Sequence, residues 1–587
     1  MTTTTSKWPA RTFKPFLPAL LAAIPLSTFA ALLWSAARLG PDWPWYLQWS
    51  DAALGSNMFE LQSDVASPQG LPLMLAAHGV GFVFAVGRLF TEGWLSPVNG
   101  AVFAGFAMAI VAWWAMADLL FKASKSAGAT AACLAVGFIG THLGFYTLSH
   151  ASESFSIALV AVLGVVLVHR DTDNWRTAAL AGVSTALLVT VRSYLVVYAA
   201  APCLAVLLTT LQSARRGRRP WWRASMVAAL VIVPPLLGVL QILGVNAWMT
   251  GSPFRSPYVF GNAEFRSMDL SRPDFVTIFT HPWHGLLVYH PLYLVAGLAT
   301  ATAVWRQRHQ LDLRWVGLVA AATAIHVWLQ ASYFCWWLGT GTFGMRGLAV
   351  LGVVLLPGLA WTLNAERGWR RVFWLAPCTG CCLWSLALHV QHESNFLTFG
   401  PLLAAQRAVL LRPSLWTGLA AAGLAGVVSS RLWRREPGWP TVVAPFAALA
   451  TLALALDTIT YRELPIQHGV GNAAIALAFL GGVGGAGLAS LPPRSTASRV
   501  VPASLTVIGV FFLITTAMFL RLFSATEQYL AESHSLPARF TAQSTVLLPE
   551  VVATLDEYNT VPGFEERKAE YKQFVDEAVS KAAIKAR

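Results

Sequence analysis

The chain has 587 residues, of which 56% are hydrophobic and only 12% are charged, and its mean hydropathy is +0.56. Many apolar runs approach the roughly 20 residues that a helix needs to cross a bilayer. Together with 25 Trp, these values predict an all-α integral membrane protein built as a polytopic helical bundle. The net charge of +13 does not indicate a nucleic-acid partner, because the basic residues fall in short clusters between the apolar runs.

The apolar runs predict about 13–15 spans. Their approximate ranges are 16–37, 99–121, 128–149, 152–168, 177–191, 194–211, 225–247, 285–304, 315–335, 347–363, 372–390, 415–430, 440–457, 470–490 and 500–520.

The loops between these spans alternate in charge. With the N-terminus in the cytoplasm, the cytoplasmic loops receive basic clusters such as 122–125, 215–223 and 306–308. The external loops hold acids instead, among them Asp42, Asp51 and Glu264. This alternation follows the positive-inside rule and predicts a bacterial-type inner or plasma membrane protein whose C-terminus is external.

Two apolar segments are ambiguous. Residues 71–90 are apolar enough to span, but a crossing there would invert the basic loops that follow. We therefore expect this segment to lie in the interface or to re-enter, within one long external loop over 38–98. The short pair 177–191 and 194–211 is split by Arg192 and is expected to be a broken or re-entrant pair.

The chain divides into two parts by composition. Residues 1–521 form the predicted transmembrane domain, in which the first span is read as an uncleaved anchor rather than a signal peptide because its apolar run is long. Residues 522–587 turn abruptly polar and predict a small external helical appendage, too short for a sizeable catalytic domain.

Familiar soluble-enzyme motifs are missing from the sequence. It contains no P-loop, no G-x-G-x-x-G after a strand and no G-x-S-x-G. Cys378 and Cys381 have C-x-x-C spacing, but they lie in an apolar span without a second pair, which favours small buried residues over a metal or redox site.

The candidate site residues fall in the predicted external loops. Asp42 and Asp51 stand among aromatic residues directly after the first span, where acids suggest chemistry at the bilayer surface. His150 and Glu153 are three residues apart at a helix start and so share a face. The favourable helix dipole explains a Glu at this position, but His150 beside it at the membrane surface favours a functional pair.

Three further clusters follow along the chain. TGSPFRSPYVFGNAEF at 250–265 contains Arg255, and HPWHGLLVYHPLYLV at 281–295 contains His284 and Tyr289. The histidines of the second segment suggest a metal site or interfacial anchors, with spacings that suit no single helical face. In YFCWWLGTGTFGMRGLAV at 333–350, Arg346 either snorkels to the interface or holds a phosphate or carboxylate within a glycine-rich loop.

The order of these clusters resembles the GT-C superfamily of membrane glycosyltransferases, which contains protein O-mannosyltransferases and lipid A aminoarabinose transferases. Members carry an acid just after the first span, and Asp42 in GPDWPWYL matches that position. Many bacterial members then have segments similar to GSPFRSPY, HGLLVYHPLYL and WWLGTGTFGMR, in that order. The resemblance covers roughly residues 16–365. Many relatives follow the first-loop Asp with Glu, where this chain has Trp43, so the base is left open between Asp42 and Asp51.

The resemblance implies an enzyme that moves a sugar from a polyprenyl-phosphate donor to a glycan, lipid or protein acceptor at the outer face. It implies Asp42 or Asp51 as the base, Arg346 and Arg255 as phosphate ligands, and His150, Glu153, His284 and Tyr289 around the substrate. A divalent metal is compatible with the family, but no second metal-binding acid is placed, so metal dependence stays open.

Two alternatives remain. A lipid-linked oligosaccharide flippase would concentrate its charges at mid-span rather than outside. An O-antigen ligase-like enzyme would use a similar donor, with its large loop late in the chain.

Overall fold

The computed structural model describes residues 43–55, 78–149, 151–169, 175–254, 270–271, 273–280, 285–332, 344–367, 370–371, 373–378, 380–382 and 384–385. Every regular element within these ranges is helical, which confirms the all-α prediction for this part of the chain. The predicted first span 16–37, the predicted spans beyond residue 400 and the predicted appendage 522–587 lie outside the described residues.

Four helical stretches in the described part are long and apolar enough to cross a membrane: Asn99–Ser124, Trp175–Arg215, Trp221–Thr250 and Leu313–Ala331. The last two carry largely exposed apolar side chains, since only 17% of the most apolar window of each is buried. An apolar surface of this kind needs a lipid environment. The chain is therefore suited to a bilayer.

The first long helix, α4 (Pro97–Ser124), is fixed at both ends by local capping. Ser96 Oγ accepts from the Asn99 amide at 3.4 Å, and Pro97 occupies the first turn, where its missing N–H costs nothing. Lys125 closes the helix in the left-handed region with a φ of 55°, and Ser126 then caps α5 (Ala127–Gly140). This short turn sets α4 and α5 side by side.

The predicted span 128–149 is divided between α5 and α6 (His142–Ser149), with an extended break at Thr141. The next helix, α7 (Ala151–Val168), runs in the same direction as α4. Phe155 packs with Ala101 and Val102 near the start of α4, and His169 Nε2 lies 2.8 Å from Asp118 Oδ2 near its end.

The segment around Arg192 is a broken pair of helices. The first half, α8 (Trp175–Arg192), ends at that arginine, the 3₁₀ turn η2 (Ser193–Ala199) follows, and α9 (Ala200–Arg215) returns antiparallel to α8. A longer helix, α10 (Trp221–Thr250), then runs parallel to α8. The two pack so closely that a Cβ at Gly182 would lie 1.9 Å from the Leu230 carbonyl oxygen.

The following elements complete the described part of the bundle. Short helices α12 (Phe275–Thr280) and α13 (Leu286–Tyr289) precede α14 (Leu292–Gln307) and α15 (Leu313–Ala331), and the turn η3 (Arg346–Leu348) leads into α16 (Leu351–Ala365). Thr300 Oγ1 donates to the Leu355 carbonyl at 2.8 Å, and Arg306 pairs with Glu366, so α14 and α16 run parallel. Asn364 Nδ2 donates to the Ser124 carbonyl at 2.8 Å, which joins the end of α16 to the end of α4.

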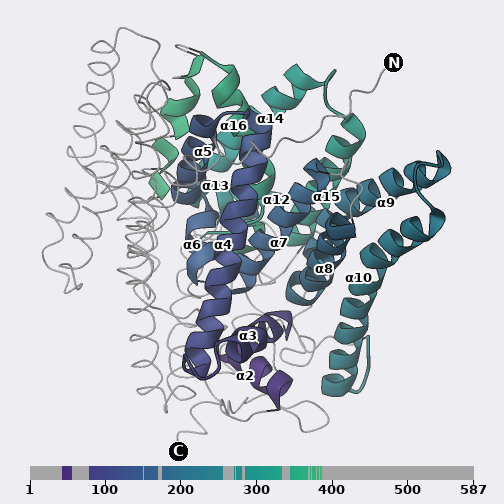
Figure 1. The fold of residues 1–587 in the computed structure, drawn as a ribbon. Helices are drawn as coiled ribbons and strands as arrows, with labels where there is room; N and C mark the ends of the chain where they lie inside the picture. Colours follow the sequence, from purple (N-terminus) through teal and green to yellow (C-terminus); the bar gives the residue numbers. More distant parts are fainter. Residues whose placement is uncertain are drawn as a thin grey trace, which may run out of the picture.

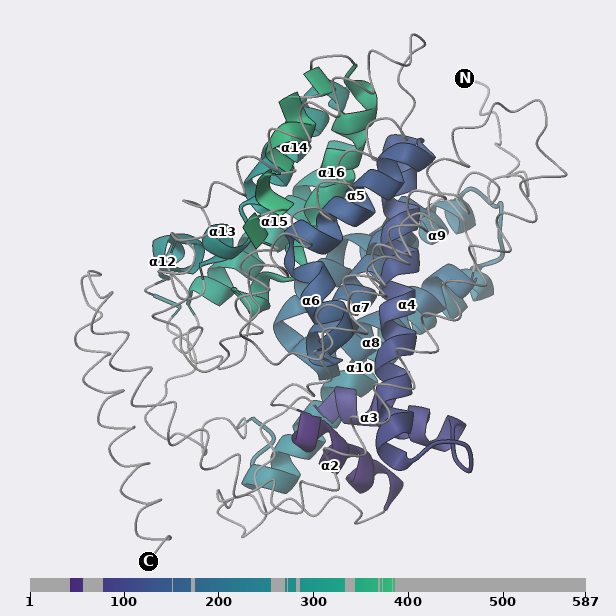
Figure 2. The same cartoon turned by 90° about the vertical axis from the view of Figure 1, so that its left-hand side faces the viewer.

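The helix directions give the bundle two distinct ends (Figures 1 and 2). The basic end contains the turns that follow α4, α9, α14 and α16. The basic residues there lie at 122–125, 215–223 and 306–308 and at Arg367, Arg370 and Arg371. The opposite end, named the cap end, contains α2 (Trp43–Leu54), α3 (His78–Phe90), the starts of α4 and α7, the end of α8, and η3.

Two helices of the predicted first loop pack across the cap end. Residues 78–90 form α3, whose 13 residues extend about 20 Å. Its glycines allow close contact, since a Cβ at Gly79 would lie 2.3 Å from Thr190 Oγ1 and one at Gly81 would lie 2.2 Å from Trp49 Cβ. Burial lowers the pKa of His78 to about 4, so this histidine is neutral where it packs against the Trp49 ring.

A buried ion pair joins α2 to α3. Arg88 Nη1 lies 2.8 Å from Asp51 Oδ1 and also donates to Ser50 Oγ at 2.5 Å, and both charged side chains are about 5% exposed. A buried charge that loses its partner is strongly destabilising, so each member of the pair needs the other.

Candidate functional site

The structure describes four of the eight residues that the sequence nominates for a site. Glu153 lies in the first turn of α7, Arg346 begins η3, Asp51 lies in α2 and Tyr289 ends α13. Asp42, His150, Arg255 and His284 lie outside the described residues. Trp43, the first residue of α2, directly follows Asp42 in the chain.

Glu153 and Arg346 meet at the cap end. The side chain of Glu153 is only 2% exposed, and its Oε1 lies 3.6 Å from Arg346 Nε. Arg192, the last residue of α8, makes a shorter ion pair with the same oxygen. One carboxylate therefore holds two guanidinium groups that come from elements far apart in the chain.

Ser152 completes the environment of the carboxylate. Its hydroxyl donates to Glu153 Oε2 at 2.7 Å and accepts from Arg192 Nη2 at 3.1 Å. The carboxylate also lies in the first turn of α7, where the helix dipole favours a negative charge. These contacts favour an ionised Glu153 that holds its neighbours in place, and they do not favour Glu153 as a general base.

A second connection joins Arg192 to the segment of Arg346. Arg192 Nη1 donates to the Tyr194 hydroxyl at 2.5 Å, and the Tyr194 ring stacks on His326 with centroids 5.7 Å apart. His326 Nε2 donates to the Gly347 carbonyl at 2.9 Å, directly after Arg346. Because that nitrogen carries the proton, Nδ1 of the neutral ring accepts from the Tyr198 hydroxyl at 3.0 Å.

The cluster brings two cationic side chains together. The guanidinium groups of Arg192 and Arg346 both pair with the single carboxylate of Glu153. The side chain of Arg192 is 14% exposed and that of Arg346 is 33% exposed, so Arg346 is the more accessible of the two. Such an arrangement is suited to hold an anion, and a guanidinium binds phosphate through paired hydrogen bonds.

The cap helices pack directly beside this cluster. Tyr46 of α2, Phe84 of α3 and Phe155 of α7 form a chain of edge-to-face rings with centroid separations of 6.0 and 6.1 Å. Phe155 lies two residues after Glu153, and Val191, next to Arg192, joins the same apolar group. Helices α2 and α3, which belong to the first loop predicted from the sequence, therefore pack beside the ion-pair cluster.

Asp51 has a structural partner that the sequence does not predict. The ion pair with Arg88 buries its carboxylate between α2 and α3, so Asp51 stabilises the cap. Asp42, the other acid nominated as a base, lies outside the described residues.

Tyr289 is buried beneath η3 among histidines. The rings of His142 and His290 have centroids 4.0 Å apart, and His142 Nδ1 lies 3.2 Å from the Tyr293 hydroxyl. Gly344, with a φ of +67°, touches this group, since a Cβ there would lie 3.0 Å from Tyr289 Cβ and 3.1 Å from His142 Nε2. Tyr289 thus packs against Gly344 in the segment that leads to Arg346, and it is only 1% exposed.

The donor groups in the described part do not make a metal site. No cluster of three or more His, Cys, Asp or Glu suited to a metal ion occurs among the described residues. Glu153 and Asp51 are each held by arginine, and guanidinium groups compete with a cation for the same oxygens. The residues described therefore do not fit a divalent metal.

Sequence reasoning did not nominate Arg192 as a site residue. It is the only charged residue between Arg176 and Arg215, and a lone charge in an apolar stretch is a functional candidate in its own right. The lone charge indicates a break in the helix, but the sequence does not identify Glu153 as the ion-pair partner of Arg192.

Comparisons with known proteins identify no relative, since no family model, no curated protein and no solved structure matches the chain.

We predict that Gly344→Ala destabilises the fold more than Gly93→Ala. Both glycines have a positive φ, at +67° and +82°, so both substitutions cost backbone strain. A Cβ at Gly93 has nothing within 4 Å, whereas one at Gly344 crowds Tyr289, His142 and His290. The difference should be about 1–3 kcal/mol, the usual cost of overpacking, measured by unfolding in detergent. Equal losses in the two variants would contradict the packing described for Gly344.

Proposed function

We propose that the chain is a membrane glycosyltransferase of the GT-C type that transfers a sugar from a polyprenyl-phosphate donor to a hydroxyl acceptor at the outer membrane face. The observation that carries the proposal is the ion-pair cluster of Glu153, Arg192 and Arg346, which places two guanidinium groups at the cap end, with the side chain of Arg346 33% exposed. The order of sequence motifs supports the same assignment, because Arg346 ends the WWLGTGTFGMR segment.

The reaction requires a base at the acceptor and a cation at the leaving group. The acceptor oxygen attacks the anomeric carbon of the sugar while its proton passes to the Asp42 carboxylate. The bond between the anomeric carbon and the phosphate oxygen breaks, and polyprenyl phosphate leaves with the electron pair. Arg346 stabilises the developing phosphate charge, while Glu153, which is itself paired with Arg192, holds the Arg346 guanidinium in place.

We propose that the cap end faces the outside and the basic end faces the cytoplasm. The basic clusters at 122–125, 215–223 and 306–308 support this orientation through the positive-inside rule. The placement of α3 across the cap end supports a first loop that does not cross.

Cysteine labelling in intact cells tests this orientation. In a background without the native cysteines, Ala53→Cys on α2 should react with a membrane-impermeant reagent and His309→Cys after α14 should not. Both side chains are exposed in the structure, so accessibility to solvent is matched between them. Labelling of both positions, or of His309→Cys alone, would contradict the orientation.

The assignment of the base is tested with Asp42→Asn in a vesicle assay of sugar transfer from polyprenyl-phosphate monosaccharides. We expect turnover to fall about 10²–10⁴-fold, the usual contribution of a general base, with an unchanged unfolding transition. Asp51→Asn should instead destabilise the cap, and the double variant Asp51→Asn/Arg88→Met should recover stability and activity because no unpaired charge remains.

A stable but inactive Asp51→Asn/Arg88→Met protein, beside a fully active Asp42→Asn, would move the base to Asp51. If wild-type protein carried the donor across the vesicle membrane without releasing polyprenyl phosphate, the flippase alternative would replace the transferase.

The role of Arg346 is tested with Arg346→Lys and Arg346→Ala. Lysine keeps the charge but not the paired hydrogen bonds to phosphate, each of which contributes about 1.5–3 kcal/mol. We therefore expect the donor KM to rise at least about tenfold in Arg346→Lys and transfer to be abolished in Arg346→Ala. Arg314→Lys is the matched control, because Arg314 is an exposed partner of Asp312 at the basic end. Wild-type kinetics in Arg346→Lys would reduce Arg346 to an interfacial anchor.

A further inference from the structure

One long stretch of the chain contains several arginines but no acidic residue. Between Asp173 and Glu264 the sequence has no Asp or Glu, and it carries eight arginines: Arg176, Arg192, Arg215, Arg216, Arg218, Arg219, Arg223 and Arg255. This stretch forms α8, η2, α9 and α10. These elements contain no carboxylate side chain, so an ion pair of any of their arginines needs an anion from outside the stretch.

Five of these arginines gather in the turn between α9 and α10. That turn passes through Gly217 with a φ of +64°, which no side chain obstructs, and α10 begins at Trp221 directly after Pro220. Arg215, Arg216, Arg218 and Arg223 are exposed. The ion pairs of the described residues include none of these four, in contrast to Arg192 at the other end of α8.

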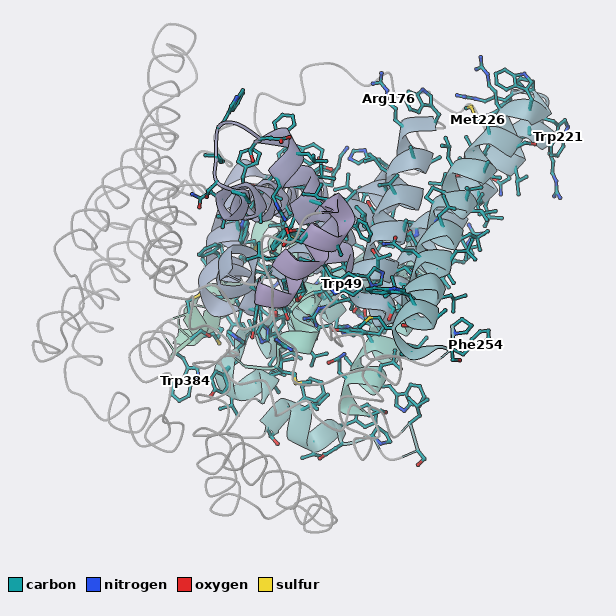
Figure 3. The ribbon with its side chains drawn as sticks, turned by 90° about the horizontal axis from the view of Figure 1, so that it is seen from below. Trp49, Arg176, Trp221, Met226, Phe254 and Trp384 are labelled. Carbon is teal, nitrogen blue, oxygen red and sulfur yellow. The ribbon has the colours of Figure 1, made fainter. Side chains whose placement is uncertain are left out.

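Exposed tryptophans surround the same turn. Trp221 and Trp222 are 57% and 62% exposed at the start of α10, and Trp175 is 55% exposed at the start of α8. Arg223 lies over the Trp222 ring at 5.2 Å, and Arg176 lies over Trp175 at 5.6 Å. Ala178 and Val227 belong to one apolar cluster, so the two helix starts adjoin, and Figure 3 shows Arg176, Met226 and Trp221 along the same edge of the molecule.

The surface lies at the edge of an apolar helix face. Ile232, Val233, Leu236 and Leu237 of α10 are all exposed, beginning about three turns beyond Trp221. A helix with this face lies against lipid tails, which places its first turn at the level of the lipid headgroups. Tryptophan rings and arginine side chains are the groups that proteins present at that depth.

We propose that the surface formed by Arg215, Arg216, Arg218, Arg223, Trp221 and Trp222 is a binding site for anionic phospholipid headgroups. The guanidinium groups bind the lipid phosphates, and the indole rings pack among the headgroups and the upper parts of the acyl chains. This role is separate from sugar transfer, because the surface lies at the basic end and the Arg346 cluster lies at the cap end. It supplies the counter-charges that the acid-free stretch lacks.

The test uses the purified full chain and measures retention of phosphatidylglycerol against phosphatidylcholine by native mass spectrometry. The variant is the triple substitution Arg215→Gln/Arg216→Gln/Arg218→Gln. The matched control is Arg308→Gln/Arg367→Gln/Arg370→Gln, which removes the same charge from exposed arginines at the same end. Each arginine near an anionic surface contributes a factor of about five, so the first variant should bind phosphatidylglycerol roughly 100-fold more weakly, while the control stays near wild type.

The unfolding midpoint in phosphatidylcholine is the control for folding. Both triple variants should keep the wild-type midpoint, because the exchanged side chains are exposed. Equal losses of phosphatidylglycerol binding in the two variants would mean that binding depends on net charge alone, which would overturn the proposed site. Unchanged retention in the first variant would overturn it as well. Displacement of phosphatidylglycerol by a short oligonucleotide at equal phosphate concentration would assign the surface to phosphodiesters in general and contradict a lipid site.

Discussion

The burial of one carboxylate determines the arrangement of the cap end. Glu153 is almost fully enclosed, and an ionised carboxylate in that position costs several kcal/mol unless charged partners and hydrogen bonds compensate it. Arg192 and Arg346 supply the charges, and Ser152 supplies a hydrogen bond. Since these groups belong to α7, α8 and η3, the carboxylate holds three chain segments at fixed positions. The apolar contacts of Tyr46, Phe84 and Phe155 then attach the cap helices to the same point.

The same requirement explains the break between α8 and α9. An arginine within an apolar stretch is stable only if it reaches a partner or the interface. Arg192 reaches Glu153 and Tyr194 where α8 gives way to the 3₁₀ turn η2. His326 holds this turn against η3 through Tyr198 and the Gly347 carbonyl. The backbone irregularity therefore lies where polar side chains converge, which is where irregular structure is tolerated in a membrane protein.

Individual positions could be predicted from the sequence, but their pairings could not. Composition identifies the all-helical class, and local patterns nominate Glu153 and Arg346 because each is a charge at the end of an apolar run. Their contact depends on how α7, α8 and η3 pack, which no spacing along the chain encodes. Asp51 shows the limit most clearly. Its position after the first span indicates a base, but the packing of α3 against α2 brings Arg88 to it and makes it part of a structural ion pair.

The acid-free stretch between Asp173 and Glu264 has different consequences at its two ends. At the cap end, Arg192 pairs with a carboxylate from α7, and Arg346, the more exposed of the two arginines, pairs with the same carboxylate. At the basic end, four exposed arginines take part in none of the described ion pairs: Arg215, Arg216, Arg218 and Arg223. Arg223 lies over the ring of the exposed Trp222. The acid-free stretch therefore places arginines at both ends of the described bundle. The arginine at the cap end, Arg192, is paired with a buried carboxylate, whereas the four exposed arginines at the basic end form the surface that we propose for anionic headgroups.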